Sequence, residues 1–246
     1  MPARAQSTAR RIVQAVLLLA VLAILLALGT WQVERLHWKE ALLADIETRR
    51  AAPPVPLADI EAMAAAGGDI EYRTVTVTGR FLNNKERHFF ATYDGAPGFY
   101  VYTPLQLADG RFVFINRGFV PYDNKEPEMR MQGQLTGEQS VTGLARARLS
   151  GKPSFVVPDN DIAKNIFYWK DLDAMIASDG LPSDEALPFF IDADNTPNPK
   201  GMPIGGVTLI DLPNNHLQYA LTWYGLAAAL VAVSGVFLLR RKGKDE

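Results

Sequence analysis

The stretch Pro213–Ala227, PNNHLQYALTWYGLA, marks the point where a polar segment ends and an apolar run begins. It contains His216, one of three histidines in the chain of 246 residues. Because each residue of an α-helix advances about 100°, a helix that starts here places several side chains close to one line. These side chains are His216, Ala220, Trp223 and Ala227. A potential metal ligand, two small residues and one flat ring on one face predict a surface for either a flat cofactor or another helix.

Two runs without any charged residue contain much of the apolar sequence, namely residues 12–29 and 217–239. The second run of 23 residues spans roughly 34 Å as a helix, which is enough to cross a bilayer core of about 30 Å. Residues 30–33 extend the first run to a similar length. Because a single segment satisfies its backbone within a membrane only as a helix, the sequence predicts transmembrane helices at residues 12–33 and 215–239.

Basic residues flank both predicted membrane helices on their outer sides. Residues 1–11 contain three arginines, and residues 240–246 contain four Arg or Lys residues. The positive-inside rule therefore predicts that both termini are cytoplasmic, and that residues 34–214 form a stalk and a domain on the opposite side. Residues 30–216 carry 18 basic and 25 acidic residues, and this acidic balance argues against nucleic acid as a partner.

A cleaved signal peptide is an alternative interpretation of the first apolar run. The preceding residues are basic, and Ala27-Leu28-Gly29 has the form of a small-x-small cleavage site. The run is longer than the usual signal core of about 7–15 residues. Its length therefore favours a transmembrane helix.

A stripe of two tryptophans and an arginine follows the first apolar run, on a helix that we expect to continue to about Thr48. Trp31, Arg35 and Trp38 share one face because they are four and three residues apart. Two interpretations remain open. The stripe is either an interfacial aromatic belt in which Arg35 reaches lipid head groups, or a cation–π cluster that grips a partner or the second membrane helix.

Between the membrane runs the sequence changes to alternating apolar and polar residues, rich in β-branched and aromatic side chains. Short turn sequences such as Ala108-Asp109-Gly110 separate these segments. The expected strands are residues 72–81, 86–93, 99–107, 111–120, 139–148, 188–192 and 206–210, and the expected short helices are residues 57–66 and 171–177. The predicted fold class is thus a membrane protein of α+β type, in which two transmembrane helices flank one antiparallel β-rich domain with a few helices.

The residues offer little for catalysis or for a metal centre with several protein ligands. The chain contains no cysteine, no G-x-S-x-G or H-E-x-x-H motif and no phosphate-binding loop. The histidines His37, His88 and His216 are far apart and form no local metal clip. His88 is expected to be exposed or partly covered on a strand. The six methionines are dispersed, which argues against a copper chaperone.

Two interpretations of His216 remain open from the residues alone. A neutral imidazole is a good ligand of haem iron, Trp223 offers a ring on which a porphyrin can stack, and Arg35 lies where it can reach the propionates. Alternatively, Asn214 or Asn215 caps the helix, His216 faces water, and the alanines pack on the first helix.

Three motifs resemble those of the SURF1 (Shy1-related) family of cytochrome oxidase assembly factors. They are Leu28–Gln32 (LGTWQ), Asn116-Arg117-Gly118, and Asn214–Gly225 (NNHLQYALTWYG), in the same order between the same two membrane runs. One departure is Phe119, where a tryptophan is common in the family.

This resemblance implies a chaperone, not an enzyme, in a bacterial inner membrane with its β-rich domain in the periplasm. Its cargo would be haem a, received from haem a synthase and inserted into oxidase subunit I, with membrane lipids as further contacts. An alternative is a scaffold that stabilises subunit I without binding haem. The family's terminal histidine corresponds to His216, the proposed ligand of the haem iron. The expected haem-binding residues are Trp31, Arg35, His216, Tyr219, Ala220, Trp223 and Ala227.

Overall fold

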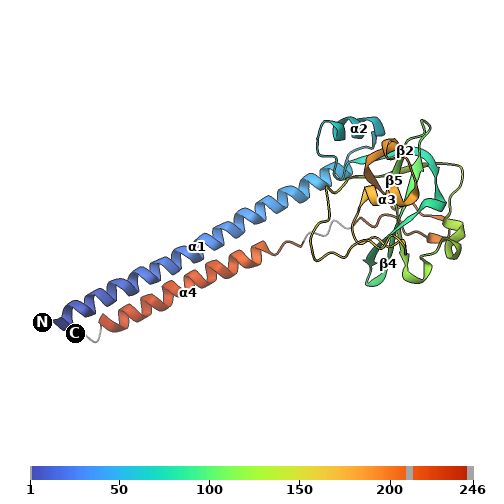
Figure 1. Cartoon of the computed structure of the whole chain (residues 1–246). Helices are drawn as coiled ribbons and strands as arrows, with labels where there is room; N and C mark the ends of the chain where they lie inside the picture. The colour runs from blue at the N-terminus through green and yellow to red at the C-terminus, as the bar shows by residue number, and fades with distance from the viewer. Residues whose placement is uncertain (1, 209–212, 243–246) are drawn as a thin grey trace. The chain divides into compact units, whose positions relative to one another are not determined.

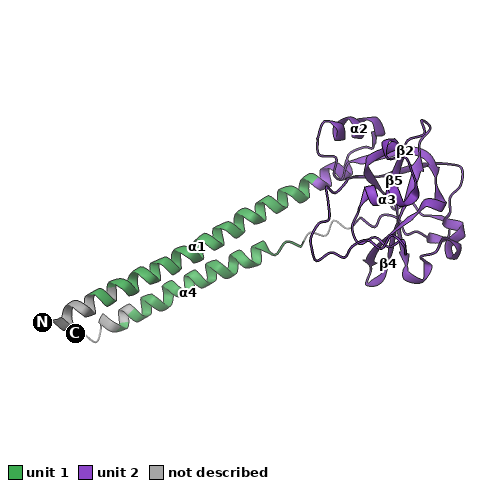
Figure 2. Ribbon diagram, viewed as in Figure 1, with its two compact units in different colours: residues 1–45, 211–246 green, residues 46–210 purple. Residues whose placement is uncertain are grey.

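The computed structural model describes residues 2–208 and 213–242. The chain forms two compact units, which Figure 2 distinguishes by colour. One unit contains residues 1–45 and 211–246, and we call it the helix pair. The other contains residues 46–210, and we call it the β-rich domain.

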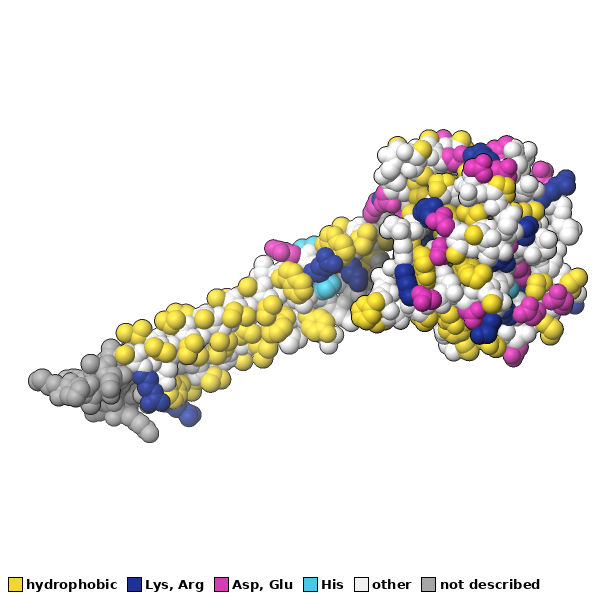
Figure 3. Space-filling model, in the orientation of Figure 1, with side chains coloured by type: hydrophobic (Ala, Val, Ile, Leu, Met, Phe, Trp, Pro, Cys, Tyr) yellow, Lys and Arg dark blue, Asp and Glu magenta, His cyan; other side chains and the backbone are white. Residues whose placement is uncertain are grey.

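The helix pair contains α4 (His216–Lys242) and α1 (Pro2–Ala51) up to residue 45, and the two helices run side by side in opposite directions (Figure 1). Each contains a segment that is long and apolar enough to cross a membrane, Ile12–Ala51 in α1 and His216–Phe237 in α4. Helix α1 continues a few residues beyond its predicted end near Thr48. Many large apolar side chains of both helices are exposed, as the yellow surface in Figure 3 shows. Such a surface needs an apolar environment or a partner to cover it.

In its described residues, the β-rich domain contains seven strands, two α-helices and several short 3-10 helices. The strands are β1 (Val55–Pro56), β2 (Thr74–Phe81), β3 (Arg87–Tyr93), β4 (Ala96–Gln106), β5 (Phe112–Pro121), β6 (Glu138–Ala147) and β7 (Ala186–Ala193). The α-helices are α2 (Leu57–Ala65) and α3 (Leu172–Asp179). The 3-10 helices are η1 (Asn83–Lys85), η2 (Tyr122–Asn124), η3 (Pro127–Gly133), η4 (Ser183–Glu185) and η5 (Pro199–Gly201).

The strands form one sheet in the order β1-β2-β6-β7-β5-β4-β3. Strand β2 also pairs with β4 at its far end, so that the sheet curls back on itself. Six predicted strand regions coincide with β2 to β7, because these segments are rich in β-branched and aromatic residues and are bounded by turn sequences. The seventh prediction was residues 206–210. Residues 206–208 are not in a strand, and residues 209–210 lie outside the described residues.

The prediction of a purely antiparallel sheet is wrong, because the sheet is mixed. Strand β7 pairs in parallel with β5 and antiparallel with β6. It arrives through the long connection that contains α3 and inserts between two strands that run in opposite directions. It must therefore be parallel to one of them. The two-residue strand β1 is also parallel to its neighbour β2.

Strand β5 lies at the centre of the domain core. Every residue from Phe112 to Val120 is buried, because other side chains cover both faces of the strand. One cluster packs α2 through Ile60 against β2, β5 and β7. A second cluster packs α3 through Met175 against aromatic side chains that include Phe114 and Phe190. Asn116 and Arg117, two polar residues in the middle of β5, are therefore buried.

Candidate functional site

The two helices approach each other closely where Gly29 of α1 faces Tyr224 of α4. Gly29 is buried, and a Cβ atom added to it would lie 2.8 Å from the Tyr224 ring. The hydroxyl groups of Thr30 and Tyr224 are 3.1 Å apart and share a hydrogen bond. Small residues let helices approach closely in a membrane, where packing and polar contacts drive association. A glycine at position 29 is therefore what leaves room for the tyrosine ring.

His216 is the first residue of α4 and is half-buried. Its Nδ1 atom lies 2.7 Å from Oε1 of Gln32, a buried residue of α1. Because an amide oxygen only accepts hydrogen bonds, Nδ1 is the donor in this contact, and in the neutral imidazole Nε2 then keeps its lone pair. Nε2 has no hydrogen-bond partner among the residues that the structure describes. This is the tautomer in which imidazole binds a metal through one nitrogen while a neighbour holds the other.

The chain that leads into α4 is also held to α1. Lys39 Nζ donates a hydrogen bond to the carbonyl oxygen of Pro213. The side-chain oxygen of Asn214 is buried and has no partner among the described residues, so it does not cap α4. His216 is not the water-facing residue that the capping interpretation expected, because it is half-buried and hydrogen-bonded to α1.

The remaining predicted haem-binding residues of α4 divide into a covered group and an open group. Ala220 and Ala227 are 2% and 3% exposed and lie on the same face as Tyr224, which packs against α1. Trp223 is half-buried, and Tyr219 is exposed. The two alanines therefore pack on the first helix, as the capping interpretation expected. The aromatic rings and His216 Nε2 lie at the margin of this contact.

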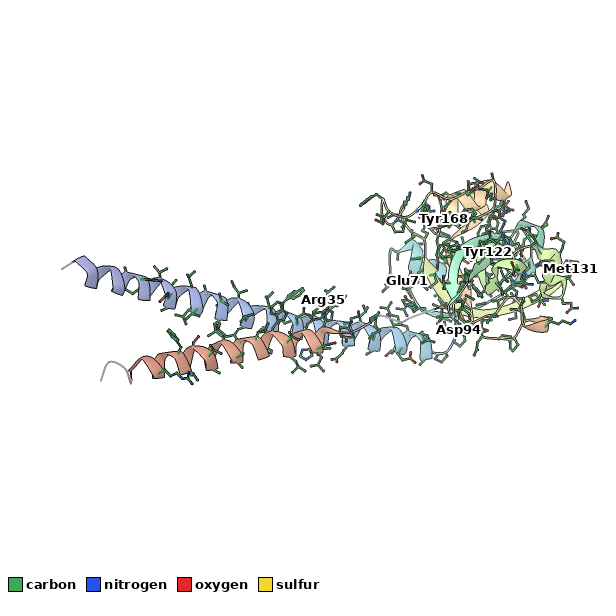
Figure 4. The ribbon with its side chains drawn as sticks, turned by 90° about the horizontal axis from the view of Figure 1, so that it is seen from below. Arg35, Glu71, Asp94, Tyr122, Met131 and Tyr168 are labelled. Carbon is green, nitrogen blue, oxygen red and sulfur yellow. The ribbon has the colours of Figure 1, made fainter. Side chains whose placement is uncertain are left out.

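The predicted stripe on α1 forms a cation–π pair within the helix. The Arg35 guanidinium lies 3.8 Å from the centre of the Trp38 ring. Trp31 and Trp38 are each about half exposed, and Arg35 is exposed. Figure 4 places Arg35 where the two helices run side by side. The stripe flanks Gln32 by about 60–120° around the helix, so its rings and its charge remain open to a ligand, to lipid or to a partner.

His37 does not share this side of the helix. It is five residues beyond Gln32, which places it about 140° away around α1, and its side chain is exposed. No group of three or more His, Asp or Glu side chains in the described parts of the chain is placed to hold a metal ion. The helix pair thus presents one histidine nitrogen without a converging second histidine.

The β-rich domain contains a buried charged cluster that the sequence did not reveal. His88 is only 2% exposed, so the expectation of an exposed or partly covered residue is wrong. Glu86 pairs with Arg130, and its Oε1 lies 3.3 Å from His88 Nε2. Burial raises the pKa of Glu86, but hydrogen bonds from His88 and Arg130 outweigh burial and hold this pKa below its usual value.

The burial of His88 follows from the way the edge of the sheet is covered. Strand β3 lies at the end of the sheet order, but it also pairs with a segment outside the named strands, because Phe90 N donates to the Phe167 carbonyl oxygen over 2.8 Å. Asn165 Nδ2 lies 3.1 Å from His88 Nδ1. Arg130 reaches the cluster from η3. These partners are 40 to 80 positions away in the sequence, so no local pattern predicts them.

The Asn116-Arg117-Gly118 motif lies in the centre of β5. Asn116 Nδ2 donates to Asp192 Oδ1 on β7 over 3.0 Å, and Gly118 N donates to Asn116 Oδ1 over 3.1 Å. Gly118 has a φ of 124°, and a Cβ atom there would lie 2.0 Å from the Ile204 carbonyl oxygen. The asparagine and the glycine therefore have structural roles, whereas the arginine between them lies beside a cavity.

Comparison with known proteins matches residues 19–228 to the SURF1 family. The chain belongs to the SURF1 family. Surfeit locus protein 1 from Rattus norvegicus is 40% identical over 229 residues, which are 86% of this chain and 71% of the relative. The human protein of that name is 40% identical over 223 residues, covering 82% and 70%. A SURF1-like protein from Drosophila melanogaster is 36% identical over 231 residues, covering 86% and 73%.

The match to the SURF1 family spans the two motifs that meet in the helix pair. Gly29, Thr30 and Gln32 belong to the first motif, and they contact Tyr224 and His216 of the last motif. The residues were visible in the sequence as separate motifs. No local pattern predicts the hydrogen bond between Gln32 and His216, because 184 positions separate the two residues.

Proposed function

We propose that this SURF1-family protein is an assembly factor for a haem–copper terminal oxidase, and that it holds haem a at His216 and assists its insertion into subunit I. The observation that carries this proposal is the Nδ1 contact with Gln32, which leaves Nε2 available to bind iron. The proposed role moves a cargo without breaking a covalent bond of that cargo, so it requires no catalytic group.

The residues around His216 fit a haem in part. The exposed rings of Trp31 and Tyr219 offer flat apolar surfaces, and the exposed Arg35 offers a charge for a propionate. Trp223 is half-buried next to this margin. Ala220 and Ala227 do not offer clearance, because they are covered. The proposed binding surface is therefore the margin of the helix contact rather than its centre.

A single histidine ligand suits a protein that must release its cargo. A haem bound by one neutral imidazole keeps its other axial position open or weakly held. A receiving site with two histidines would then bind the same iron more tightly. Haem a synthase is the proposed donor of the cargo, and subunit I is the proposed receiver.

The proposed location follows from the two apolar helices and the basic residues at both ends. Residues 12–33 and 215–239 would cross a bacterial inner membrane, with residues 1–11 and 240–246 in the cytoplasm. Residues 34–214 would then lie in the periplasm. Cysteine labelling is a direct test, because the natural chain contains no cysteine. A single cysteine at exposed Asp184 should react with a membrane-impermeant reagent added to the periplasm, and protection of this cysteine would contradict the proposed orientation.

The test of haem binding is purification of the full chain from cells that make haem a. The wild-type protein should carry haem a, and His216→Ala should lose most of it. His37→Ala is the matched control, because it removes an exposed histidine on another face of α1 and should retain haem. Full haem retention by His216→Ala would contradict the proposed ligand.

A scaffold that stabilises subunit I without holding haem is the second candidate. It is favoured by the open stripe of Trp31, Arg35 and Trp38, which is suited to a protein partner. If the wild-type protein co-purifies with haem-free subunit I but never carries haem, the scaffold is the better account. If Trp38→Ala no longer co-purifies with subunit I but still binds haem, the scaffold role and the haem-binding role belong to different residues.

A further inference from the structure

Three arginines that are buried or half-buried in the β-rich domain have a carboxylate partner. Arg130 pairs with Glu86, and Arg87 Nη2 lies 2.5 Å from Asp179 Oδ1. Arg146 makes two ion pairs, at 2.8 Å to Glu71 Oε2 and at 3.0 Å to Asp192 Oδ2. Such pairing is the rule for buried charges, because an unpaired charge loses its hydration without compensation.

Arg117 differs from these three arginines. It is 2% exposed, yet no carboxylate in the described residues lies within 4.0 Å of it. Its Nη1 donates to Asn83 Oδ1 over 3.3 Å, its Nη2 donates to the Gly133 carbonyl oxygen, and its guanidinium lies 4.6 Å from the centre of the Phe81 ring. Burial lowers the pKa of Arg117 to about 10, so the side chain remains protonated at neutral pH.

The donors of Arg117 are not all used. A guanidinium has five N–H groups, and the hydrogen bonds to Asn83 and Gly133 use two of them. No acceptor for Nε is found in the described parts of the chain. A planar guanidinium with free N–H groups matches the two oxygens of a carboxylate.

Arg117 lines a cavity of about 230 Å³ in the β-rich domain. The cavity is small compared with the 300–1,000 Å³, roughly, of pockets for drug-sized ligands. Its other walls include Phe81, Ser140, Asp194 and Asn198. Asp194 Oδ1 accepts a hydrogen bond from a backbone N–H over 3.0 Å, and its Oδ2 has no partner among the described residues. The cavity thus contains a cation and, more than 4.0 Å away, a carboxylate.

We propose that this cavity binds a small monocarboxylate that also carries a hydroxyl or ammonium group. Its carboxylate would be held by Arg117, and its hydroxyl or ammonium group would donate to Asp194. Asp194 would repel a ligand with a second anionic group, so dicarboxylates and phosphate are excluded. This site is separate from His216 and does not rest on haem binding.

Calorimetric titration of the full chain in lipid nanodiscs tests the proposal with five probes: lactate, alanine, propionate, succinate and inorganic phosphate. Lactate and alanine should bind at least about tenfold more tightly than propionate, which has the carbon skeleton of lactate but no hydroxyl donor. Succinate and phosphate should not bind. If neither lactate nor alanine binds saturably, the site is refuted and Arg117 has only a structural role.

Two variants test the site while leaving the buried Arg117 in place. Asp194→Asn should weaken the preference for lactate over propionate, because a neutral acceptor replaces a charged one, and should admit succinate, because the repelling charge is gone. Ser140→Trp should fill the cavity and abolish binding without altering any contact of Arg117. Asp184→Asn is the matched control, since Asp184 is exposed outside the cavity and should bind as wild type. Unchanged ligand selectivity in Asp194→Asn would refute the role of Asp194, and unchanged binding in Ser140→Trp would refute the cavity.

Discussion

Different kinds of interaction stabilise the helix pair and the β-rich domain. Helices α1 and α4 meet through Gly29, Ala220 and Ala227, with two polar links at Tyr224 and His216, and leave many large apolar side chains exposed. The β-rich domain buries aromatic clusters and ion pairs on both sides of a central strand. The domain therefore has a tightly packed core, whereas the helix pair has an exposed apolar surface beside a contact made by few residues. This difference favours the helix pair as the place for a transient cargo.

The largest expected effect comes from breaking the buried ion pair of the domain. Glu86→Gln leaves the Arg130 charge buried without its partner and should cost about 3–5 kcal/mol of unfolding free energy. Urea unfolding of the full chain, followed by the β-sheet circular-dichroism signal, measures it. The double variant Glu86→Leu/Arg130→Leu is the control and should lose much less, because it leaves no unpaired charge. Equal losses of unfolding free energy in both variants would show that packing, rather than the ion pair, stabilises this cluster.

A smaller but still large loss should follow Gly118→Ala. Its φ of 124° disfavours any side chain, and the new Cβ would overlap the Ile204 carbonyl oxygen. Strain at such a position costs about 1–3 kcal/mol before the overlap is counted. Gly151→Ala is the matched control, because a Cβ at Gly151 meets nothing within 4 Å. The same unfolding measurement should show little change for Gly151→Ala, and a tolerated Gly118→Ala would contradict the close approach seen in the structure.

The stability of the domain should also depend on pH through Asp179. Its Oδ1 pairs with Arg87, but its Oδ2 is buried without a partner in the described residues, and burial raises its pKa to about 7. Because the folded protein binds this proton more tightly than the unfolded chain, the stabilisation is complete below about pH 4 and is lost as the pH rises through 7. The loss between pH 5 and 8 should be on the order of 2 kcal/mol.

Asp179→Asn should flatten this part of the pH profile, whatever its effect on overall stability. Unfolding free energies measured at pH 5, 6, 7 and 8, for both proteins, provide the test. An unchanged slope in Asp179→Asn would assign the pH dependence to another group.

The smallest expected effect is in the helix pair. Gly29→Ala places a methyl group against the Tyr224 ring and should weaken helix contact by about 1 kcal/mol without altering the unfolding of the domain. Spin labels at the exposed positions Leu19 and Val233 report the distribution of distances between the helices. This distribution should broaden in Gly29→Ala. Gly225→Ala is the control, since a Cβ there meets nothing within 4 Å. Broadening in Gly225→Ala as well would argue against a specific contact at Gly29.

Local patterns in the sequence were enough to predict both long helices and most strands. The apolar runs and the alternation of Thr74–Phe81 (TVTVTGRF) depend only on neighbours in the sequence. The mixed sheet could not be predicted in this way, because the position of β7 between β5 and β6 depends on how a long connection returns. The burial of His88 has the same cause, since Arg130 and Asn165 reach it from distant segments.

Sequence patterns and the family resemblance named the residues of the candidate site, but they did not predict how these residues are arranged. The position of His216 at the start of an apolar run was visible, and the family resemblance gave it a role. Its hydrogen bond to Gln32 was not visible, and neither was the burial of Ala220 and Ala227 against α1. A helical wheel shows which residues share a face, but it does not show whether that face meets a cofactor or another helix.

The most direct test of the central claim is the haem a spectrum of His216→Gly, recorded with and without added imidazole. If His216 Nε2 is the iron ligand, the variant purifies with little haem, and imidazole restores haem binding with a spectrum close to that of the wild type. Gln32→Ala should bind haem more weakly than the wild type, because the imidazole is no longer held in one orientation. A His216→Gly protein that keeps the wild-type haem content and spectrum without imidazole would contradict the claim.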